Sequence, residues 1–113
     1  MVMVRINYHA QSVIQNIIGV QMKRGSKPDE NHAEIRDGLR AIIGRWSVFD
    51  CKDFGGGFPD LMVGFRGKNF LLEIKRDKKA KLTPAEVAFK TTWEGQWNRV
   101  ESLDEAMKVI GLV

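Results

Sequence analysis

Two carboxylates and a lysine lie within an otherwise apolar stretch of this 113-residue chain. The run Gly-Gly-Gly-Phe-Pro-Asp ends at Asp60, twelve mostly apolar residues follow, and the next three residues are Glu73, Ile74 and Lys75. Charged side chains in a buried segment carry a large desolvation penalty unless they are paired or bind a cation. We therefore interpret Asp60, Glu73 and Lys75 as a candidate chemical site.

The register of a predicted hairpin decides whether these side chains lie together. Residues 58–66 and 68–76 have the pattern of two strands joined by a short turn. Side chains alternate along a strand, so Glu73 and Lys75 share a face. A two-residue turn over the Arg-Gly pair places Asp60 opposite Glu73, and one over the Gly-Lys pair places it opposite Lys75. Both registers put all three side chains on one face, whereas a three-residue loop without a bulge would separate them.

The chemistry that fits this set is metal-assisted phosphodiester hydrolysis. Two carboxylates roughly 5 Å apart repel unless a proton or a cation lies between them, and oxygen donors suit Mg²⁺ or Mn²⁺. Such a metal would bind a scissile phosphate and acidify a water molecule, while Lys75 could stabilise the attacking hydroxide or the developing charge. Further ligands are needed. The main-chain carbonyl of Ile74 is within reach, and Glu34, beside an apolar helical stripe, is the best remaining candidate.

Basic and glycine-rich segments next to these residues suggest where a nucleic acid would bind. The net charge is +4, and three lysines directly follow the second hairpin strand, where they would flank a bound phosphate. No Lys-Ser/Thr pair follows the glycine run, which excludes a nucleotide P-loop, so we expect the run to let a DNA backbone approach the metal. His32 is either a phosphate contact, a group that orients a ligand, or an exposed surface residue. The predicted DNA contacts are Gly56, Gly57, Lys78, Lys79, Lys81 and His32.

The surrounding pattern predicts an α/β fold with a central mixed sheet flanked by helices. In chain order we expect a helix at 29–44, a strand at 46–51, the hairpin, a helix at 84–94, a strand at 97–101 and a last helix that Ser102 opens. Capping boxes are predicted at Asn31/Glu34, Thr83/Glu86 and Ser102/Glu105. The apolar stripe of the first helix is Ile35, Leu39, Ile42 and Ile43, and that of the last is Leu103, Ala106, Met107 and Ile110.

Residues 1–28 are predicted to form an N-terminal arm, separate from a domain at 29–113. Residues 9–20 have helical spacing, and their apolar stripe could pack on the domain or on a second copy of it, or the arm could contact DNA. The single cysteine, Cys51, is interpreted as a strand residue. Trp93 and Trp97 are interpreted as core or interface anchors. No segment approaches the roughly 18 apolar residues of a membrane span, so we expect a soluble, cytoplasmic protein without a membrane partner.

The motifs around Asp60 resemble those of a known nuclease family. Pro59-Asp60 followed twelve residues later by Glu73-x-Lys75 resembles the PD-(D/E)xK nuclease superfamily. Four segments together are similar to its virus-type replication-repair (VRR-NUC) branch, which includes small stand-alone phage and bacterial members. These segments are Asn-His-Ala-Glu-Ile at 31–35, Gly-Gly-Gly-Phe-Pro-Asp-Leu at 55–61, Leu-Glu-Ile-Lys at 72–75 and Leu-Thr-Pro-Ala-Glu at 82–86. The resemblance covers about residues 29–111.

This resemblance implies a restriction-endonuclease-like core of order αβββαβ(α). It implies Glu34, Asp60 and Glu73 as metal ligands and Lys75 as the catalytic lysine. Stand-alone members resemble Holliday junction resolvases in acting as homodimers. Many relatives carry glutamine where this chain has Glu86, so Glu86 is left as either a helix cap or a site residue.

We therefore expect a structure-selective DNA endonuclease that depends on Mg²⁺ or Mn²⁺. We expect it to act as a homodimer on branched DNA, such as a four-way junction, in the cytoplasm of a bacterial or phage-infected cell. Two alternatives are kept. One is a nuclease for flaps or linear DNA ends. The other is a non-catalytic DNA-binding module of the same fold. Such a module would be expected to lack one of the two acids or the lysine, but this chain has Asp60, Glu73 and Lys75.

Overall fold

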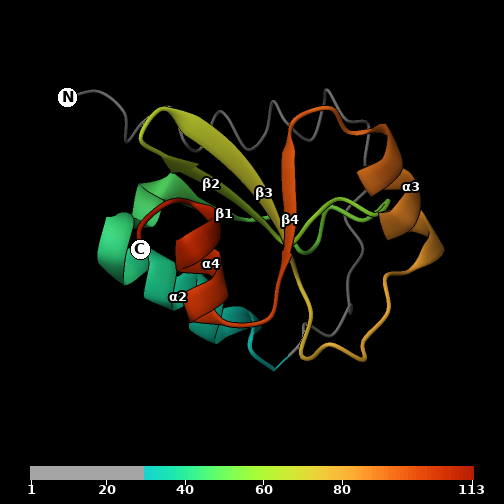
Figure 1. Cartoon of the computed structure of the whole chain (residues 1–113), viewed down its shortest axis with the longest axis horizontal. Coiled ribbons are helices and arrows are strands. Elements are labelled where there is room, and N and C mark those ends of the chain that lie inside the picture. The colour runs from blue at the N-terminus through green and yellow to red at the C-terminus, as the bar shows by residue number, and fades with distance from the viewer. Residues whose placement is uncertain (1–29) are drawn as a thin grey trace.

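A four-stranded mixed sheet with the order β1-β2-β3-β4 organises residues 30–113, the part of the chain that the structure, a computed structural model, describes (Figure 1). Its elements are α2 (His32–Ile43), a 3₁₀ turn η1 (Arg45–Ser47), β1 (Val48–Asp50), β2 (Leu61–Phe65), β3 (Lys68–Ile74), α3 (Pro84–Thr92), β4 (Gln96–Val100) and α4 (Leu103–Val109). The predicted arm and its helix at 9–20 lie outside the described residues. The α/β fold and the mixed sheet are confirmed.

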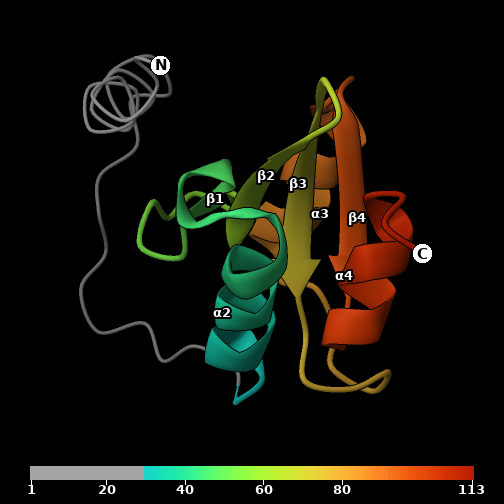
Figure 2. The same ribbon diagram turned by 90° about the vertical axis from the view of Figure 1, so that its left-hand side faces the viewer.

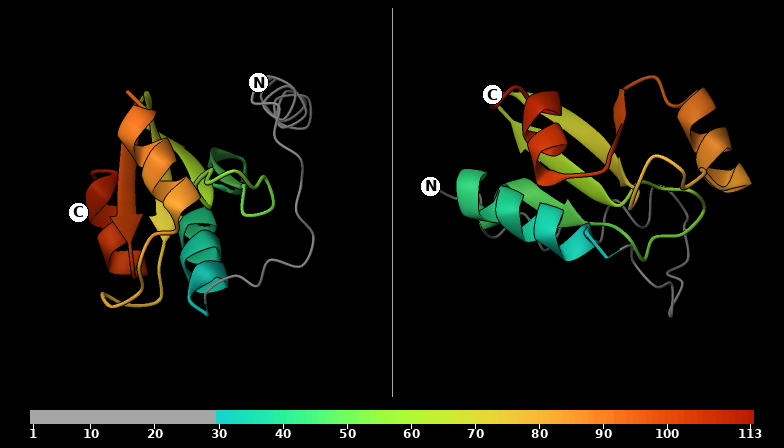
Figure 3. Two further views of the ribbon diagram at one scale, coloured as in Figure 1. Left: turned by 90° about the vertical axis from the view of Figure 1, so that its right-hand side faces the viewer. Right: turned by 60° about the horizontal axis from the view of Figure 1, so that its bottom comes forward.

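Helices cover the sheet on both sides. Helices α2 and α4 lie side by side on one face, and α3 lies on the other, as the views in Figure 2 and Figure 3 show. The core between the sheet and the pair α2 and α4 consists of fully buried aliphatic side chains, among them Ile35, Leu39, Leu61, Leu72 and Val100. Burial of this continuous apolar surface holds the strand ends that carry the candidate site. No helix within residues 30–113 is long and apolar enough to cross a membrane.

The hairpin closes over a two-residue turn. Arg66 and Gly67 both have positive φ, 51° and 80°, as a type I′ turn requires. Phe65 is paired with Lys68, and Leu61 with Leu72. Extending this antiparallel register by one residue brings Asp60 opposite Glu73. The first of the two predicted registers is therefore confirmed.

One of the three predicted capping boxes is complete. Around α3, Thr83 Oγ1 accepts from Glu86 N at 3.2 Å and Glu86 Oε1 accepts from Thr83 N at 2.9 Å. At α4, Ser102 Oγ accepts from Glu105 N, but the Glu105 carboxylate accepts from Glu101 N instead of closing the box. Both α3 and α4 are nevertheless capped at their first turns by a side-chain oxygen, which satisfies donors that the helix itself leaves free.

The capping box predicted at the start of α2 is wrong. Asn31 makes no side-chain cap. Its Nδ2 instead donates to the carbonyl oxygen atoms of Lys75, at 3.0 Å, and Glu101, at 2.7 Å. The Asn31 side chain therefore joins the start of α2 to the chain segments that leave β3 and β4, a tertiary role that the local sequence pattern does not reveal.

The segment after α2 differs from the prediction in two ways. The predicted strand at 46–51 begins only at Val48, because Gly44 leaves the helix with φ 108° and the chain makes a 3₁₀ turn first. Cys51 follows the strand rather than belonging to it, and it is buried. Ile42, which was predicted to face the core, is 48% exposed. The other predicted core residues of α2 and α4 are buried or packed against the core.

Candidate active site

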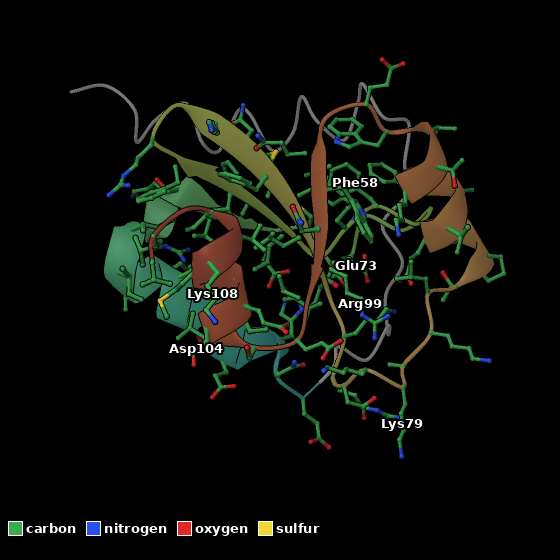
Figure 4. The ribbon with its side chains drawn as sticks, viewed as in Figure 1. Phe58, Glu73, Lys79, Arg99, Asp104 and Lys108 are labelled. Atoms are coloured by element: carbon green, nitrogen blue, oxygen red, sulfur yellow. The ribbon has the colours of Figure 1, made fainter. Side chains whose placement is uncertain are left out.

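Asp60 and Glu73 meet where β2 begins and β3 ends. The main chain holds Asp60 on both sides, because its Oδ2 accepts from Ile74 N at 2.8 Å and its carbonyl oxygen accepts from Cys51 N at 2.7 Å. The side chain of Glu73 is 3% exposed and is hydrogen-bonded to the Asp60 carboxyl group. Figure 4 shows Glu73 at the lower end of β3, beside Arg99 of the neighbouring strand β4. The predicted acid pair is thus formed.

Burial makes this acid pair hard to ionise. Desolvation, followed by the negative charges of Asp60 and Glu86, raises the pKa of Glu73 to about 10. Desolvation also raises the pKa of Asp60, although the Ile74 N–H opposes that shift. A pair of carboxyl groups in this state shares a proton at neutral pH. A divalent cation would replace that proton, so binding of a metal here is expected to release a proton and to strengthen as the pH rises.

The metal-free protein is expected to lose stability as the pH rises. Between the ordinary glutamic-acid pKa of 4.5 and the raised pKa of about 10, the folded state binds more protons than the unfolded state. The free energy of unfolding therefore falls with increasing pH in this window, by at most about 1.4 kcal/mol per pH unit. Glu73→Gln replaces the protonated acid with an isosteric amide and should remove most of this slope.

Urea denaturation of the metal-free protein between about pH 5 and pH 8 measures the slope. Glu94→Gln, which changes an exposed glutamate, is the matched control and should leave the slope unchanged. A Glu73→Gln protein that keeps the wild-type slope would show that Glu73 is not the group that holds the proton.

Lys75 lies against two carboxylates. Its Nζ atom is 2.9 Å from Glu86 Oε1 and 3.7 Å from Glu73 Oε2, and its side chain is 12% exposed. Because Glu86 Oε1 also accepts from Thr83 N, one oxygen both caps α3 and holds the lysine. Burial favours a higher pKa for Glu86, but the hydrogen bonds from the Thr83 N–H and from Lys75 outweigh it and lower the pKa. In geometric terms Glu86 is both the helix cap and a neighbour of the site.

The glycine loop is packed against the first turn of α3. A Cβ atom added to Gly57, where φ is 82°, would collide with the main-chain carbonyl of Ala85. Aromatic rings continue this contact: Phe58 meets Phe89 edge to face at 5.4 Å, and Phe89 stacks on Trp93 at 5.4 Å. In Figure 4 Phe58 lies between the sheet and α3. The close approach that requires glycine here is that of a helix in the same chain. DNA contacts from Gly56 and Gly57 stay predictions.

Gly57→Ala is expected to be strongly destabilising, and Gly67→Ala is its matched control. Both glycines have φ near 80°, but an added Cβ at Gly67 meets no atom within 4 Å. Gly67→Ala should therefore cost about 1 kcal/mol for the strained backbone alone. Gly57→Ala should cost about 2 kcal/mol more, because the added methyl group must displace the start of α3. Chemical denaturation of both variants measures the difference, and equal losses would contradict the packing of the glycine loop on α3.

Helix α2 turns His32, and not Glu34, toward the acid pair. His32 lies on the same helix face as Ile35 and Leu39 and is buried, whereas Glu34 is exposed. The expectation that Glu34 lies at the edge of the packed face is thus not met, and its metal role stays a prediction without geometric support. Of the three interpretations given for His32, that of an exposed surface residue is wrong, because the side chain is buried.

Sequence reasoning missed Asp50, which contacts His32, and the two residues that hold Asp50 in place, Arg36 and Lys52. The His32 Nε2 atom lies 3.1 Å from Asp50 Oδ1, Arg36 donates to Asp50 Oδ2 at 2.9 Å, and the main-chain N–H of Lys52 donates to Asp50 Oδ1 at 3.2 Å. The sequence signal that could have found His32 is its spacing of three from Ile35 on the apolar stripe. Asp50 ends a strand, but nothing in its local sequence indicates this partner.

The lysine-rich loop after β3 is anchored by its main chain and has exposed side chains. Asp77 Oδ1 accepts from Lys79 N, at 2.8 Å, and from Ala80 N, at 3.0 Å. Arg99 of β4 donates to the Asp77 carbonyl oxygen at 2.7 Å. The side chains of the three predicted DNA-contacting lysines, Lys78, Lys79 and Lys81, are all exposed, and Lys79 points away from the fold in Figure 4. The loop has a defined shape from which these lysines could meet a phosphate backbone.

The two tryptophans that were interpreted as anchors are only partly covered. Trp97 is half-buried with Lys90 Nζ 4.9 Å from its ring centre, and Trp93 is 44% exposed beside Phe89. A hollow of about 420 Å³ lies at the opposite end of the hairpin, near the turn, and Phe49 and Met62 are among its lining residues. No carboxylate lines this hollow, so it has no part in the site chemistry.

The donors at the acid pair fit a divalent metal in chemical type. Within residues 30–113, no group of three or more His, Cys, Asp or Glu side chains is arranged to hold a metal ion. The oxygen atoms of Asp60 and Glu73, with the main-chain carbonyl of Ile74, are nevertheless the donors that Mg²⁺ and Mn²⁺ accept. A cation bound by these oxygen atoms would replace the proton that the raised pKa of Glu73 keeps on the pair. Ligands beyond these would be water molecules or substrate phosphate, as is usual for Mg²⁺.

Comparison of the chain with protein-family models, with curated proteins and with solved structures found no match. The case for a function therefore depends on the residues and their geometry.

Proposed function

We propose that this protein is a divalent-metal-dependent DNA endonuclease of the restriction-endonuclease-like fold. The observation that carries the proposal is the buried acid pair Asp60 and Glu73, with Lys75 on the same side of the hairpin and exposed lysines directly after it. Such a pair is unfavourable for stability, which favours retention for chemistry over a structural role. Asp60, Glu73 and the Ile74 carbonyl would hold Mg²⁺ or Mn²⁺, which would supply charge stabilisation at the phosphate and an acidified water molecule.

Lys75 has the position of a group that acts on the nucleophile or the phosphate. Its Nζ atom lies 2.9 Å from Glu86 and 3.7 Å from Glu73, so its ammonium group is held beside one of the two acids. There it can donate a hydrogen bond to the attacking oxygen or to a non-bridging phosphate oxygen, where negative charge develops. In the reaction a water oxygen bonds to phosphorus, the bond from phosphorus to the leaving-group oxygen breaks, and that oxygen takes up a proton.

The substrate we propose is DNA, and branched DNA in particular. The lysines at 78, 79 and 81 are exposed on the loop that follows β3. Release of counterions when such side chains contact phosphates favours a polyanion. The choice of a four-way junction, cut by a homodimer with two symmetry-related sites, depends on the resemblance to the VRR-NUC family. Flaps and linear ends are the competing substrates of the same chemistry.

One observation favours a second candidate, a DNA-binding module without catalysis. Glu34 is exposed, and the described residues include no three-ligand group, so the site holds fewer acids than the family resemblance implies. Such a module would bind branched DNA tightly and leave it intact in Mg²⁺ or Mn²⁺.

The test is cleavage of end-labelled four-way junction, flap and linear duplex of the same sequence, with Mg²⁺, with Mn²⁺ and with a chelator. The proposal expects metal-dependent cleavage that is fastest on the junction, and loss of cleavage on chelation. If flaps or linear ends are cleaved fastest, the proposed nuclease activity stands, but the preferred substrate is not the four-way junction. Binding without cleavage under every metal condition would favour the second candidate.

A further inference from the structure

His32 has a ring nitrogen that is buried beside the acid pair and has no hydrogen-bond partner. Its side chain is 3% exposed, and Nδ1 is among the buried polar atoms of residues 30–113 that lack a hydrogen bond. Nδ1 lies 3.9 Å from Asp60 Oδ1, which is too far for a hydrogen bond. Buried polar atoms in folded proteins are nearly always satisfied, so an exception calls for an explanation, and a bound ion is one of those available.

The other side of the ring is held in a fixed orientation. Nε2 lies 3.1 Å from Asp50 Oδ1, and the Asp50 carboxylate is in turn fixed by Arg36 and by the main chain of Lys52. In the tautomer whose Nε2 proton is directed at this carboxylate, Nδ1 carries a lone pair that can bind a cation. A carboxylate that holds one ring nitrogen while the other is left available is the arrangement usual for metal-binding histidines.

We infer that His32 Nδ1 is a nitrogen ligand at the metal site of Asp60 and Glu73, an inference that rests on the proposed function. Two donors that each bind one ion at about 2.1 Å can be no more than about 4.2 Å apart. The 3.9 Å between Nδ1 and Asp60 Oδ1 is within that limit. Ligation at the octahedral angle of about 90° places the two atoms about 3.0 Å apart. His32 and Asp60, which with Glu73 are not yet arranged to hold an ion, must therefore approach by about 0.9 Å when the metal binds.

A nitrogen donor changes which metal the site prefers. Imidazole suits Mn²⁺ and the later transition metals, whereas Mg²⁺ is bound almost entirely by oxygen. The site is therefore a mixed oxygen and nitrogen site that selects Mn²⁺ over Mg²⁺, with Asp50 as the residue that positions the imidazole.

Pulsed electron paramagnetic resonance on the Mn²⁺-bound full-length protein tests this directly. The chain has two histidines, His9 and His32. Protein carrying ¹⁵N-histidine should show a ¹⁵N hyperfine coupling to Mn²⁺ in place of the ¹⁴N coupling of unlabelled protein. His9→Gln should keep that coupling and His32→Gln should lose it. This readout needs no activity, and the labelled wild type reports even if a variant does not fold.

Metal affinity provides the second readout. His32→Gln should weaken Mn²⁺ binding about 10- to 100-fold and Mg²⁺ binding much less, so the preference for Mn²⁺ collapses. Asp50→Asn should weaken Mn²⁺ binding about tenfold while the nitrogen coupling persists. Mn²⁺ that binds in an Asp60-dependent manner without histidine coupling would overturn this inference alone. Mn²⁺ binding that Asp60→Asn leaves unchanged would overturn the proposed function as well.

Discussion

Asp60→Asn is expected to lower metal-dependent DNA cleavage by at least about 10³-fold, which corresponds to about 4 kcal/mol of transition-state stabilisation. The substitution removes one of the two acids but keeps an oxygen that can accept from Ile74 N, as Asp60 Oδ2 does at 2.8 Å. The fold should therefore persist while the metal loses a charged ligand. Single-turnover cleavage of a labelled junction measures the change, and calorimetry with Mn²⁺ should show weakened binding.

Asp104→Asn is the matched control for this variant. Asp104 is exposed in the first turn of α4, well separated from Glu73 in Figure 4. Its substitution should leave cleavage within about twofold, with only a small loss of stability from the helix dipole. Asp60→Asn protein that folds and cleaves at the Asp104→Asn rate would exclude Asp60 from the metal site.

Lys75→Met is expected to lower the single-turnover rate about 10²- to 10³-fold without weakening Mn²⁺ binding. Methionine keeps much of the aliphatic stem but loses the ammonium group that lies 2.9 Å from Glu86 and 3.7 Å from Glu73. Metal binding should be unchanged or tighter, because a positive charge beside the acid pair is removed. The rate and the affinity therefore separate in this variant, whereas they fall together in Asp60→Asn.

Lys79→Met is the control for the loss of a lysine. Lys79 is exposed on the loop after β3, so its substitution should weaken DNA binding. The salt dependence of DNA binding should fall by an amount that corresponds to about one phosphate contact. The cleavage rate at saturating DNA should be unchanged. A Lys75→Met protein that behaves in the same way would assign Lys75 to DNA binding rather than to chemistry.

Local rules account for the parts of the structure that the sequence predicts well. The Arg66-Gly67 pair suits a type I′ turn, and a two-residue turn fixes the parity that brings Asp60 opposite Glu73. The capping box at Thr83 and Glu86 depends only on residues three apart, and it is present. Both features are determined within a few residues, so no knowledge of distant segments is needed.

The features that sequence reasoning missed depend on contacts between distant segments. Asn31 has the sequence of a helix cap but joins α2 to the chain after β3 and β4, across 44 and 70 residues. His32 and Glu34 differ by two positions and point to nearly opposite sides of one helix, so only one of them can face the sheet. The spacing of three between His32 and Ile35 puts His32 on the packed side, whereas its partner Asp50 comes from a distant segment that the local sequence does not reveal. The sequence leaves Glu86 open between a helix cap and a site residue. In the structure one of its oxygen atoms, Oε1, contacts both the main-chain nitrogen of Thr83 and the Nζ atom of Lys75.

The most direct test of the acid pair as a metal site is a crystal structure of the protein soaked in Mn²⁺, with anomalous scattering recorded to locate the ion. We expect a peak between the carboxylates of Asp60 and Glu73, within bonding distance of the Ile74 carbonyl, and its absence from Asp60→Asn crystals. A Mn²⁺ peak elsewhere on the protein, with the acid pair still sharing its proton, would contradict the account.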